Sequence, residues 1–146
     1  MAVILTSPVV AQPTPPPASE IEIGGPVLTV TDLDRSLNFY TNILGLHVGT
    51  RIPGSPGPGA TVTAREGSDA PFLLLRQQAA ETGKPAAFQV GTGLSRIMLV
   101  VPDVAAAATR LDAKGYAHTP ISAHHVFFVN DPDGYRFEII QRTSRH

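Results

Sequence analysis

Apolar and polar residues follow the same order twice along the chain. One stretch, starting at residue 25, reads GPVLTVTDLDRSLNFYTNILGL, and a second, starting at residue 96, reads RIMLVVPDVAAAATRLDAKGY. Each has an apolar run, an aspartate, apolar positions at helical spacing and a glycine near its end. A shift of 71 positions places Val30 on Val101 and Asp32 on Asp103. The pattern predicts one strand–helix module that occurs twice.

Both predicted helices carry signals at their two ends. Asp32 and Asp103 suit the N-cap position, where a carboxylate accepts hydrogen bonds from the free amides of the first turn. Gly45 and Gly115 suit the left-handed residue that ends a helix. Four residues of the first helix recur at helical spacing and are expected to face a sheet: Leu33, Leu37, Tyr40 and Leu44.

Strand-like runs follow each helix and are separated by turn-rich segments. The Asn-Asp-Pro-Asp-Gly segment at 130–134 predicts a hairpin between the last two runs. The predicted order is therefore β-α-β-β-β in both modules, an α+β fold. After the helices, the predicted strands span residues 47–52, 60–64 and 72–76 in the first module and 117–121, 124–129 and 135–141 in the second.

The first 20 residues differ in composition from the rest. They contain five prolines between Pro8 and Pro17, which predicts an extended, proline-rich tail. The apolar start resembles the end of a secretory signal without its basic region, so two locations stay open, cytoplasmic or exported to the periplasm. One domain is expected over residues 21–146, with modules at 21–76 and 93–141 and a linker at 77–92.

Composition excludes several classes of protein. The chain has 146 residues and no cysteine, which excludes disulfide scaffolds, thiolate zinc sites and cysteine nucleophiles. A net charge of −1 argues against a nucleic-acid partner. No apolar run approaches the roughly 20 residues that span a bilayer. Arg51, Arg65 and Arg76 are interpreted as surface charges.

Two segments resemble a known family. TVTDLDRSLNFYTNILGL and FFVNDPDGYRFEII are similar to the vicinal oxygen chelate superfamily, which includes glyoxalase I, bleomycin-resistance proteins and extradiol dioxygenases. The resemblance spans residues 21–141 and implies two βαβββ modules whose sheets curl into a half-open, mixed-sheet barrel around a small-molecule pocket. Homodimers are common in this family, and dimerisation would cover open sheet edges, so a homodimer is expected.

Enzymes of the resembled family hold a divalent metal with histidines and carboxylates at four strand positions. The resemblance places Gly25, Arg96 and either Leu73 or Leu74 at three of them, with Glu138 at the fourth. Glycine and leucine offer no ligand atom, and a guanidinium repels a dication. The sequence therefore predicts no metal ligand set and no cofactor, with a divalent metal as the alternative.

Glu138 has two interpretations. In one, its carboxylate lies at the pocket floor and orients a ligand or acts as a catalytic base. In the other, Arg96 neutralises it in a salt bridge at the place of the metal, because an unpaired buried charge is costly. The ion pair is favoured for the ligand-free state. Arg96 could still turn toward a ligand carboxylate or phosphate.

His124 is the residue that could restore a metal site. The resemblance puts Phe128 on the pocket face, and strand alternation then favours His124 on the same face. A displaced site built on His124 and Glu138 would need a third ligand, for which His47 or His118 is a guess. The alternative is that His124 lines the pocket rim and forms hydrogen bonds with solvent or ligand.

The interpretation favoured by the sequence is a protein that binds a small organic molecule without the usual metal. Phe128 would supply apolar contact, and Arg96, His124 and Glu138 would supply polar contact. One rival is a lyase, isomerase or dioxygenase with a displaced metal at His124 and Glu138. Another is metal-free catalysis with one of these two residues as general base. The last is a structural or partner-binding role with a filled barrel.

Overall fold

The computed structural model describes residues 24–54, 57–68, 70–79, 91 and 93–143. The tail predicted at residues 1–20, with its signal-like start, lies outside the described residues. The same holds for most of the linker predicted at 77–92. Within the described residues, no helix is long and apolar enough to cross a membrane.

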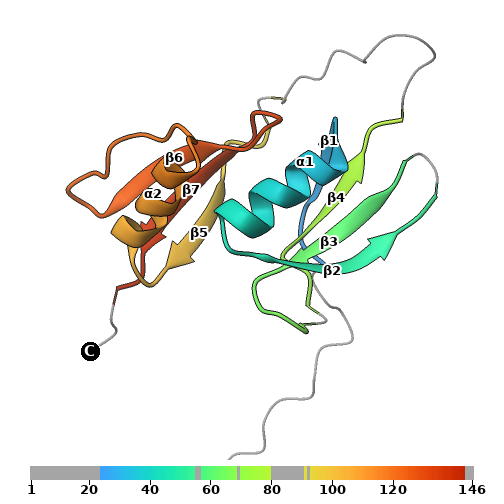
Figure 1. The fold of residues 1–146 in the computed structure, drawn as a ribbon, viewed down its shortest axis with the longest axis horizontal. Coiled ribbons are helices and arrows are strands. Elements are labelled where there is room, and N and C mark those ends of the chain that lie inside the picture. The colour runs from blue at the N-terminus through green and yellow to red at the C-terminus, as the bar shows by residue number, and fades with distance from the viewer. Residues whose placement is uncertain (1–23, 55–56, 69, 80–90, 92, 144–146) are drawn as a thin grey trace, which may run out of the picture.

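The chain forms two small mixed sheets, each with its own helix (Figure 1). In the first sheet the strand order is β1-β4-β3-β2, with β1 parallel to β4, and in the second it is β5-β7-β6, with β5 parallel to β7. The predicted α+β class and the doubled module are confirmed. The elements are β1 (Val27–Val30), α1 (Leu33–Asn38), the π-helical turn η1 (Phe39–Ile43), β2 (His47–Ile52), β3 (Gly59–Thr63), β4 (Leu73–Gln77), β5 (Ile97–Val101), α2 (Val104–Ala113), β6 (Val126–Asn130) and β7 (Arg136–Gln141).

Both helices begin at the predicted aspartates. The side chain of Asp32 accepts from the amide of Arg35 at 2.9 Å, and that of Asp103 accepts from the amide of Ala106 at 3.0 Å. A second cap, not predicted from the sequence, also occurs twice. The side-chain oxygen of Gln77 accepts from the amide of Leu33, and that of Gln141 accepts from the amide of Val104. The last strand of each module therefore helps to cap the helix of the same module.

The strand predicted at 117–121 is wrong in extent. Only His118 pairs, in a single bridge to Val129. The side-chain oxygen of Thr119 accepts the amide of Phe128 in place of a backbone carbonyl, and Pro120 has no amide to continue the ladder. No closed barrel forms in the described part of the chain, and the second sheet has three strands.

The start of the next predicted strand is also corrected. Strand β6 begins at Val126, two residues after the predicted start at His124. A tight turn occupies the intervening positions, because the amide of His125 donates to the carbonyl of Ser122 and His125 adopts a φ of 55°. A left-handed residue cannot continue a strand.

Each sheet has one face covered by its helix and one open face. Alternate strand residues such as Phe127, Phe137 and Ile139 are buried on the helix side. Residues between them, including Met98, Phe128 and Glu138, lie on the other side. The open face of the second sheet consists of Met98 and Val100 of β5, Val126 and Phe128 of β6, and Arg136, Glu138 and Ile140 of β7.

The turn between β6 and β7 joins the two modules. Asp131 is buried and accepts the hydroxyl of Tyr40 at 2.7 Å, together with the amides of Asp133 and Tyr135. The Tyr135 hydroxyl donates to the carbonyl of Thr29 at 3.0 Å. The first helical segment, which lies between the two sheets in Figure 1, is thereby fixed to the hairpin of the second module.

Asp133 adds a second set of contacts at the same junction. One carboxylate oxygen accepts the Thr31 hydroxyl at 2.6 Å and Nη2 of Arg35 at 3.0 Å, while the other accepts the Ser36 hydroxyl at 3.2 Å. The Asp133 side chain is 2% exposed, so its charge depends on these donors. The two sequence segments that carry the family resemblance therefore bind each other.

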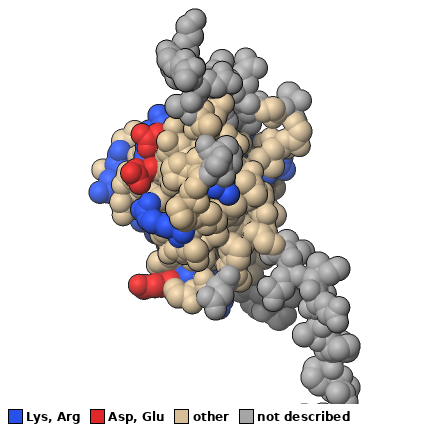
Figure 2. Space-filling model, turned by 90° about the vertical axis from the view of Figure 1, so that its right-hand side faces the viewer, with Lys and Arg blue, Asp and Glu red and all other residues tan. Residues whose placement is uncertain are grey.

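Charged side chains cover little of the surface. The face in Figure 2 has basic and acidic side chains close together along one margin and is uncharged over much of the rest. This fits the overall share of charged residues, 16%. An unpaired cluster of one sign is therefore unusual on this molecule.

Candidate functional site

The ion pair expected between Arg96 and Glu138 forms on the open face of the second sheet. Nε of Arg96 donates to Oε2 of Glu138 at 2.5 Å, and Nη1 reaches the Ser95 hydroxyl at 3.4 Å. The Glu138 side chain is 16% exposed and that of Arg96 is 49% exposed. The carboxylate is therefore mostly shielded from solvent, while part of the guanidinium is exposed. Arg96 can therefore contact a ligand while it stays paired with Glu138.

Apolar side chains flank this carboxylate. In the strand register, Glu138 lies opposite Met98 on one side and Phe128 on the other. Residues opposite each other in a sheet have their side chains on the same face. Met98 is 57% exposed, so this face offers uncovered hydrocarbon next to a charged pair.

Arg136, at the start of the central strand β7, extends the site along that strand. Its guanidinium carbon lies 4.3 Å from the centre of the Phe128 ring, a stacked cation–π arrangement. Arg136 was not predicted from the sequence. The available signal was its position two residues before Glu138, which strand alternation places on the same face.

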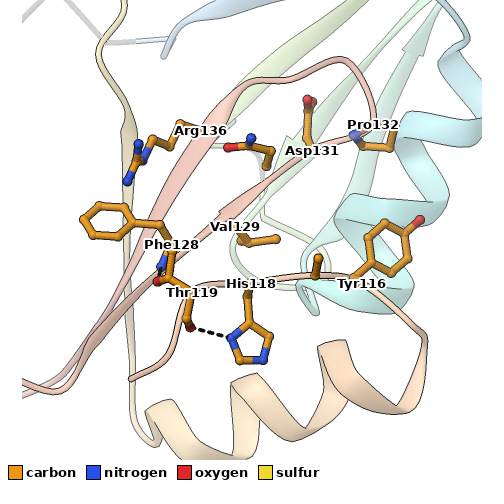
Figure 3. Close-up of a pocket in the computed structure, with 10 residues that line it drawn as sticks. Tyr116, His118, Thr119, Phe128, Val129, Asp131, Pro132 and Arg136 are labelled. Carbon is orange, nitrogen blue, oxygen red and sulfur yellow. Dashed lines mark hydrogen bonds between the residues drawn. The ribbon is translucent and has the colours of Figure 1, made fainter. Parts of the chain in front are cut away.

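A cleft of about 460 Å³ adjoins the open face at Phe128 and Arg136 (Figure 3). Its opposite wall is the segment from Tyr116 to Thr119, which bridges to Val129. The amide of Thr119 donates to the carbonyl of Phe128 at 2.9 Å, so the two walls are hydrogen-bonded together. The His118 ring turns away, forming hydrogen bonds with Thr119 and with Asp112 of α2.

Asp131 lies at the far end of this cleft and is held by the module junction. Burial raises the pKa of Asp131, and the hydrogen bonds from Tyr40, Tyr135 and Asp133 oppose that rise. Burial, and then the adjacent carboxylate, raise the pKa of the Tyr40 hydroxyl. Tyr40 therefore stays a proton donor, and the pair serves to join the modules.

His124 is not part of strand β6, contrary to the prediction. It is exposed in the turn before β6, so strand alternation from Phe128 does not extend to it. Of the two other histidines considered, His47 begins β2 in the first sheet and His118 is bonded to Asp112. The structure thus brings together Arg96, Phe128 and Glu138, while His124 is exposed in the turn before β6.

Gly25 and Leu74 belong to the first sheet. Leu74 lies opposite Val27 and Thr61 and is partly buried. Gly25 precedes β1 with a φ of 79°, and a Cβ there would lie 2.3 Å from the carbonyl oxygen of Phe72. Position 25 therefore has no room for any side chain.

Comparisons with known proteins agree on one family. The family model described as Glyoxalase/Bleomycin resistance protein/Dioxygenase superfamily matches residues 22–139. A probable lactoylglutathione lyase from Synechocystis sp. (strain ATCC 27184 / PCC 6803 / Kazusa) is 30% identical over 129 residues, which cover 82% of this chain and 94% of the relative.

Two solved structures are similar in fold. A glyoxylase/bleomycin resistance protein/dioxygenase domain from Frankia sp. EAN1pec has a TM-score of 0.69 at 23% identity, covering 88% of this chain and 96% of its own. An antibiotic binding protein from Streptomyces sp. CB03234 has a TM-score of 0.61 at 22% identity, covering 86% of this chain and 100% of its own.

The relatives correct one expectation. Several are named lactoylglutathione lyase, a metal-dependent class of enzyme. The prediction that no cofactor is involved is therefore wrong, and a divalent metal is the cofactor that the comparisons imply. The absence of a cofactor was predicted from the glycine, leucine and arginine at the family's ligand positions. Those residues give no information about ligands elsewhere in the chain.

The side chains at the four family positions do not fit such an ion. Gly25 can carry no ligand, Leu74 presents hydrocarbon, and Arg96 places a positive charge against Glu138. Among the residues that the structure describes, no three His, Asp or Glu side chains are grouped closely enough to hold a metal. Of these four residues, only Arg96 and Glu138 carry polar side chains, and the two are paired with each other.

Proposed function

Because the chain belongs to the glyoxalase/bleomycin resistance protein/dioxygenase superfamily, we propose that it binds a small organic molecule on the open face of its second sheet. One observation carries the proposal. The cleft of about 460 Å³ shares Phe128 and Arg136 with the face on which Arg96 and Glu138 form their ion pair. Ligand pockets commonly measure about 300–1,000 Å³ and combine apolar walls with few polar groups.

The surface chemistry favours a ligand with a flat apolar part and an anionic group. The Phe128 ring and the Met98 side chain offer apolar contact beside two guanidinium groups, those of Arg96 and Arg136. A guanidinium recognises a carboxylate through paired hydrogen bonds. Glu138 would hold Arg96 in place and disfavour anions that do not displace it.

Benzoate is the simplest probe of this chemistry, and its dissociation constant can be measured by ligand-observed NMR. Arg96→Gln is expected to weaken binding about tenfold or more, because a charged hydrogen bond is lost. Glu138→Gln is expected to strengthen binding, since it removes repulsion and releases Arg96. Arg51→Gln is the control, because Arg51 pairs with the exposed Asp34 on the first module. Equal affinity in all three variants would contradict the proposed site.

A second candidate is an enzyme in which Glu138 takes a proton from the bound molecule. The names of the relatives favour this alternative. Glu138 is sheltered and lies beside the cleft, as a general base requires. Turnover of S-lactoylglutathione or its precursors that disappears in Glu138→Gln, with binding retained, would support the enzyme; absence of turnover in the wild type would leave the binding protein.

We also propose that the protein forms a homodimer in which the open sheet faces of two copies enclose the bound molecule between them. Three large apolar side chains are uncovered there, with Val27 at 61%, Met98 at 57% and Val100 at 51% exposure. Water contact with these side chains is unfavourable, and a second copy would remove it.

Light scattering during gel filtration measures the oligomeric state directly. The wild type is expected at twice the chain mass, and Val100→Asp is expected to shift it to the monomer because the new charge would be buried. Thr109→Asp, on the exposed side of α2, is the matched control. A monomeric wild type at about 100 μM would rule out the proposed dimer, since a stable dimer dissociates at far lower concentration.

A further inference from the structure

A second cleft, of about 630 Å³, lies at the junction of the two modules. It is bounded by the end of η1, by the end of β5 and by α2. It shares no residue with the cleft beside Phe128. Leu99 and Val101 belong to the helix-side core, and Val100 is the one lining residue that belongs to the open face carrying the Arg96–Glu138 pair. The two clefts are therefore independent.

The floor of this cleft is apolar. It is formed by partly buried side chains that pack against the core, from the end of the first helical segment and from β5: Leu44, Leu46, Leu99 and Val101. A narrow extension between Ile43, Ala107 and Leu111 continues the apolar surface inward. An occupant with a short hydrocarbon part would be removed from water at this floor.

Three arginines surround that floor. Arg65 comes from the loop after β3, Arg110 from α2 and Arg142 from the residue after β7. Two of their backbones are fixed by hydrogen bonds, since the amide of Arg142 donates to the carbonyl of Val101 at 2.7 Å and the carbonyl of Arg65 accepts the Thr63 hydroxyl at 2.8 Å. Three cationic residues from three separate segments thus line one cleft.

Among the arginines that the structure describes, these three differ from the rest because their side chains have no partner. The described part of the chain contains five more arginines, each with one: Arg35 with Asp133, Arg51 with Asp34, Arg76 with the carbonyl of Gly57, Arg96 with Glu138, and Arg136 with the Phe128 ring. Within that part, no hydrogen bond or ion pair is made by the side chains of Arg65, Arg110 or Arg142.

One carboxylate, that of Asp103, also lines the cleft. It caps the N-terminus of α2, where it accepts a hydrogen bond from the amide of Ala106 at 3.0 Å. The amide of Val104 is capped by Gln141, so the helix end has little remaining demand for an anion. Three guanidinium groups against one engaged carboxylate leave the cleft positive, in a chain whose net charge is −1.

We propose that this cleft is a second ligand site, which takes a small organic dianion with a short apolar part, such as a phosphate monoester or a dicarboxylate. The guanidinium groups would bind the anionic head, and the leucine floor would contact the hydrocarbon. Because Arg65 belongs to one module and Arg110 and Arg142 to the other, an occupant would bind both modules together. Binding in this cleft would therefore stabilise their packing without touching the Arg96–Glu138 site.

The test is amide chemical-shift mapping of the full chain titrated with butyl phosphate and, separately, with inorganic phosphate. Saturable shifts are expected at Leu46, Arg65 and Ala106 and not at Phe128 or Glu138. Butyl phosphate is expected to bind about threefold to tenfold more tightly than inorganic phosphate because of the apolar floor. Each of Arg65→Gln, Arg110→Gln and Arg142→Gln is expected to weaken butyl phosphate binding about threefold to tenfold.

Arg51→Gln again serves as the control and is expected to leave butyl phosphate affinity unchanged. Raised salt is expected to weaken binding, since the guanidinium groups are exposed. The proposal is overturned if the three arginine variants bind butyl phosphate as the wild type does, or if the shifts appear at Phe128 and Glu138 instead. It is also overturned if no saturable binding occurs up to about 20 mM, a very weak affinity. Each of these results is independent of benzoate binding at the open face.

Discussion

Replacing Asp131 by alanine is expected to lower the free energy of unfolding by about 3–5 kcal/mol, because two buried donors and one partly buried donor lose their acceptor. The donors are the Tyr40 hydroxyl and the amides of Asp133 and Tyr135, all within 2.9 Å of the carboxylate. Tyr40 is fully buried, so water cannot replace the lost bond. Urea unfolding followed by circular dichroism measures the change.

The control for this change is Asp34→Ala. The Asp34 side chain is 88% exposed, and its contact with Arg51 is 3.7 Å long, so a change within about 0.5 kcal/mol is expected. A loss in Asp131→Ala no larger than in this control would show that the hairpin does not hold the modules together.

Asp131 also gives a pH dependence with a defined sign. Burial raises its pKa in the folded protein above the unfolded value of about 4. The folded protein therefore holds the proton more tightly, so the stability linked to this group is present below pH 4 and is lost as the pH rises through the raised pKa. Asp131→Asn does not titrate, so the difference in stability between wild type and Asp131→Asn should change in that direction across the window.

Gly25→His is expected to destabilise the fold by about 2–4 kcal/mol rather than to create a metal ligand. The backbone at Gly25 has a φ of 79°, which L-residues rarely adopt, and a Cβ would lie 2.3 Å from the Phe72 carbonyl oxygen. Either the turn before β1 or the start of β4 would have to shift. Urea unfolding again measures the loss.

Gly24→His is a matched control in the neighbouring position. A Cβ on Gly24 would meet nothing within 4 Å, and its backbone is not left-handed. A change within about 0.5 kcal/mol is expected. If Gly25→His were as stable as Gly24→His, the clash with Phe72 would not be what excludes a ligand side chain from position 25.

Local features of the fold could be predicted from the sequence because they depend on neighbouring residues. Asp32 and Asp103 cap helices, and Gly45 and Gly115 adopt positive φ after them, as their chemistry requires. The strand predicted at 117–121 does not form over its full length, because the amide of Phe128 donates to the side chain of Thr119 and Pro120 has no amide to donate. The strand propensity of the residues does not predict a hydrogen bond from a side chain to a neighbouring strand.

The candidate site likewise has some features that the sequence predicted and others that it did not. Arg96, Phe128 and Glu138 were predicted together because the family resemblance places all three at one pocket. In the structure Phe128 lies opposite Glu138 in the strand register, and Arg96 forms an ion pair with Glu138. His124 was displaced by the left-handed turn at His125. The hydrogen bond from Tyr40 to Asp131, which is 91 residues away in the sequence, could not be predicted, because it depends on how the two modules pack.

Amide chemical-shift mapping of the wild-type chain titrated with benzoate tests most directly whether the open face of the second sheet is a small-molecule site. If it is, saturable shifts are expected to centre on Arg96, Met98, Phe128 and Glu138, with the first sheet unaffected. Shifts centred instead on Thr29 and Leu74 of the first sheet, or no saturable shift at any described residue, would contradict the proposed site.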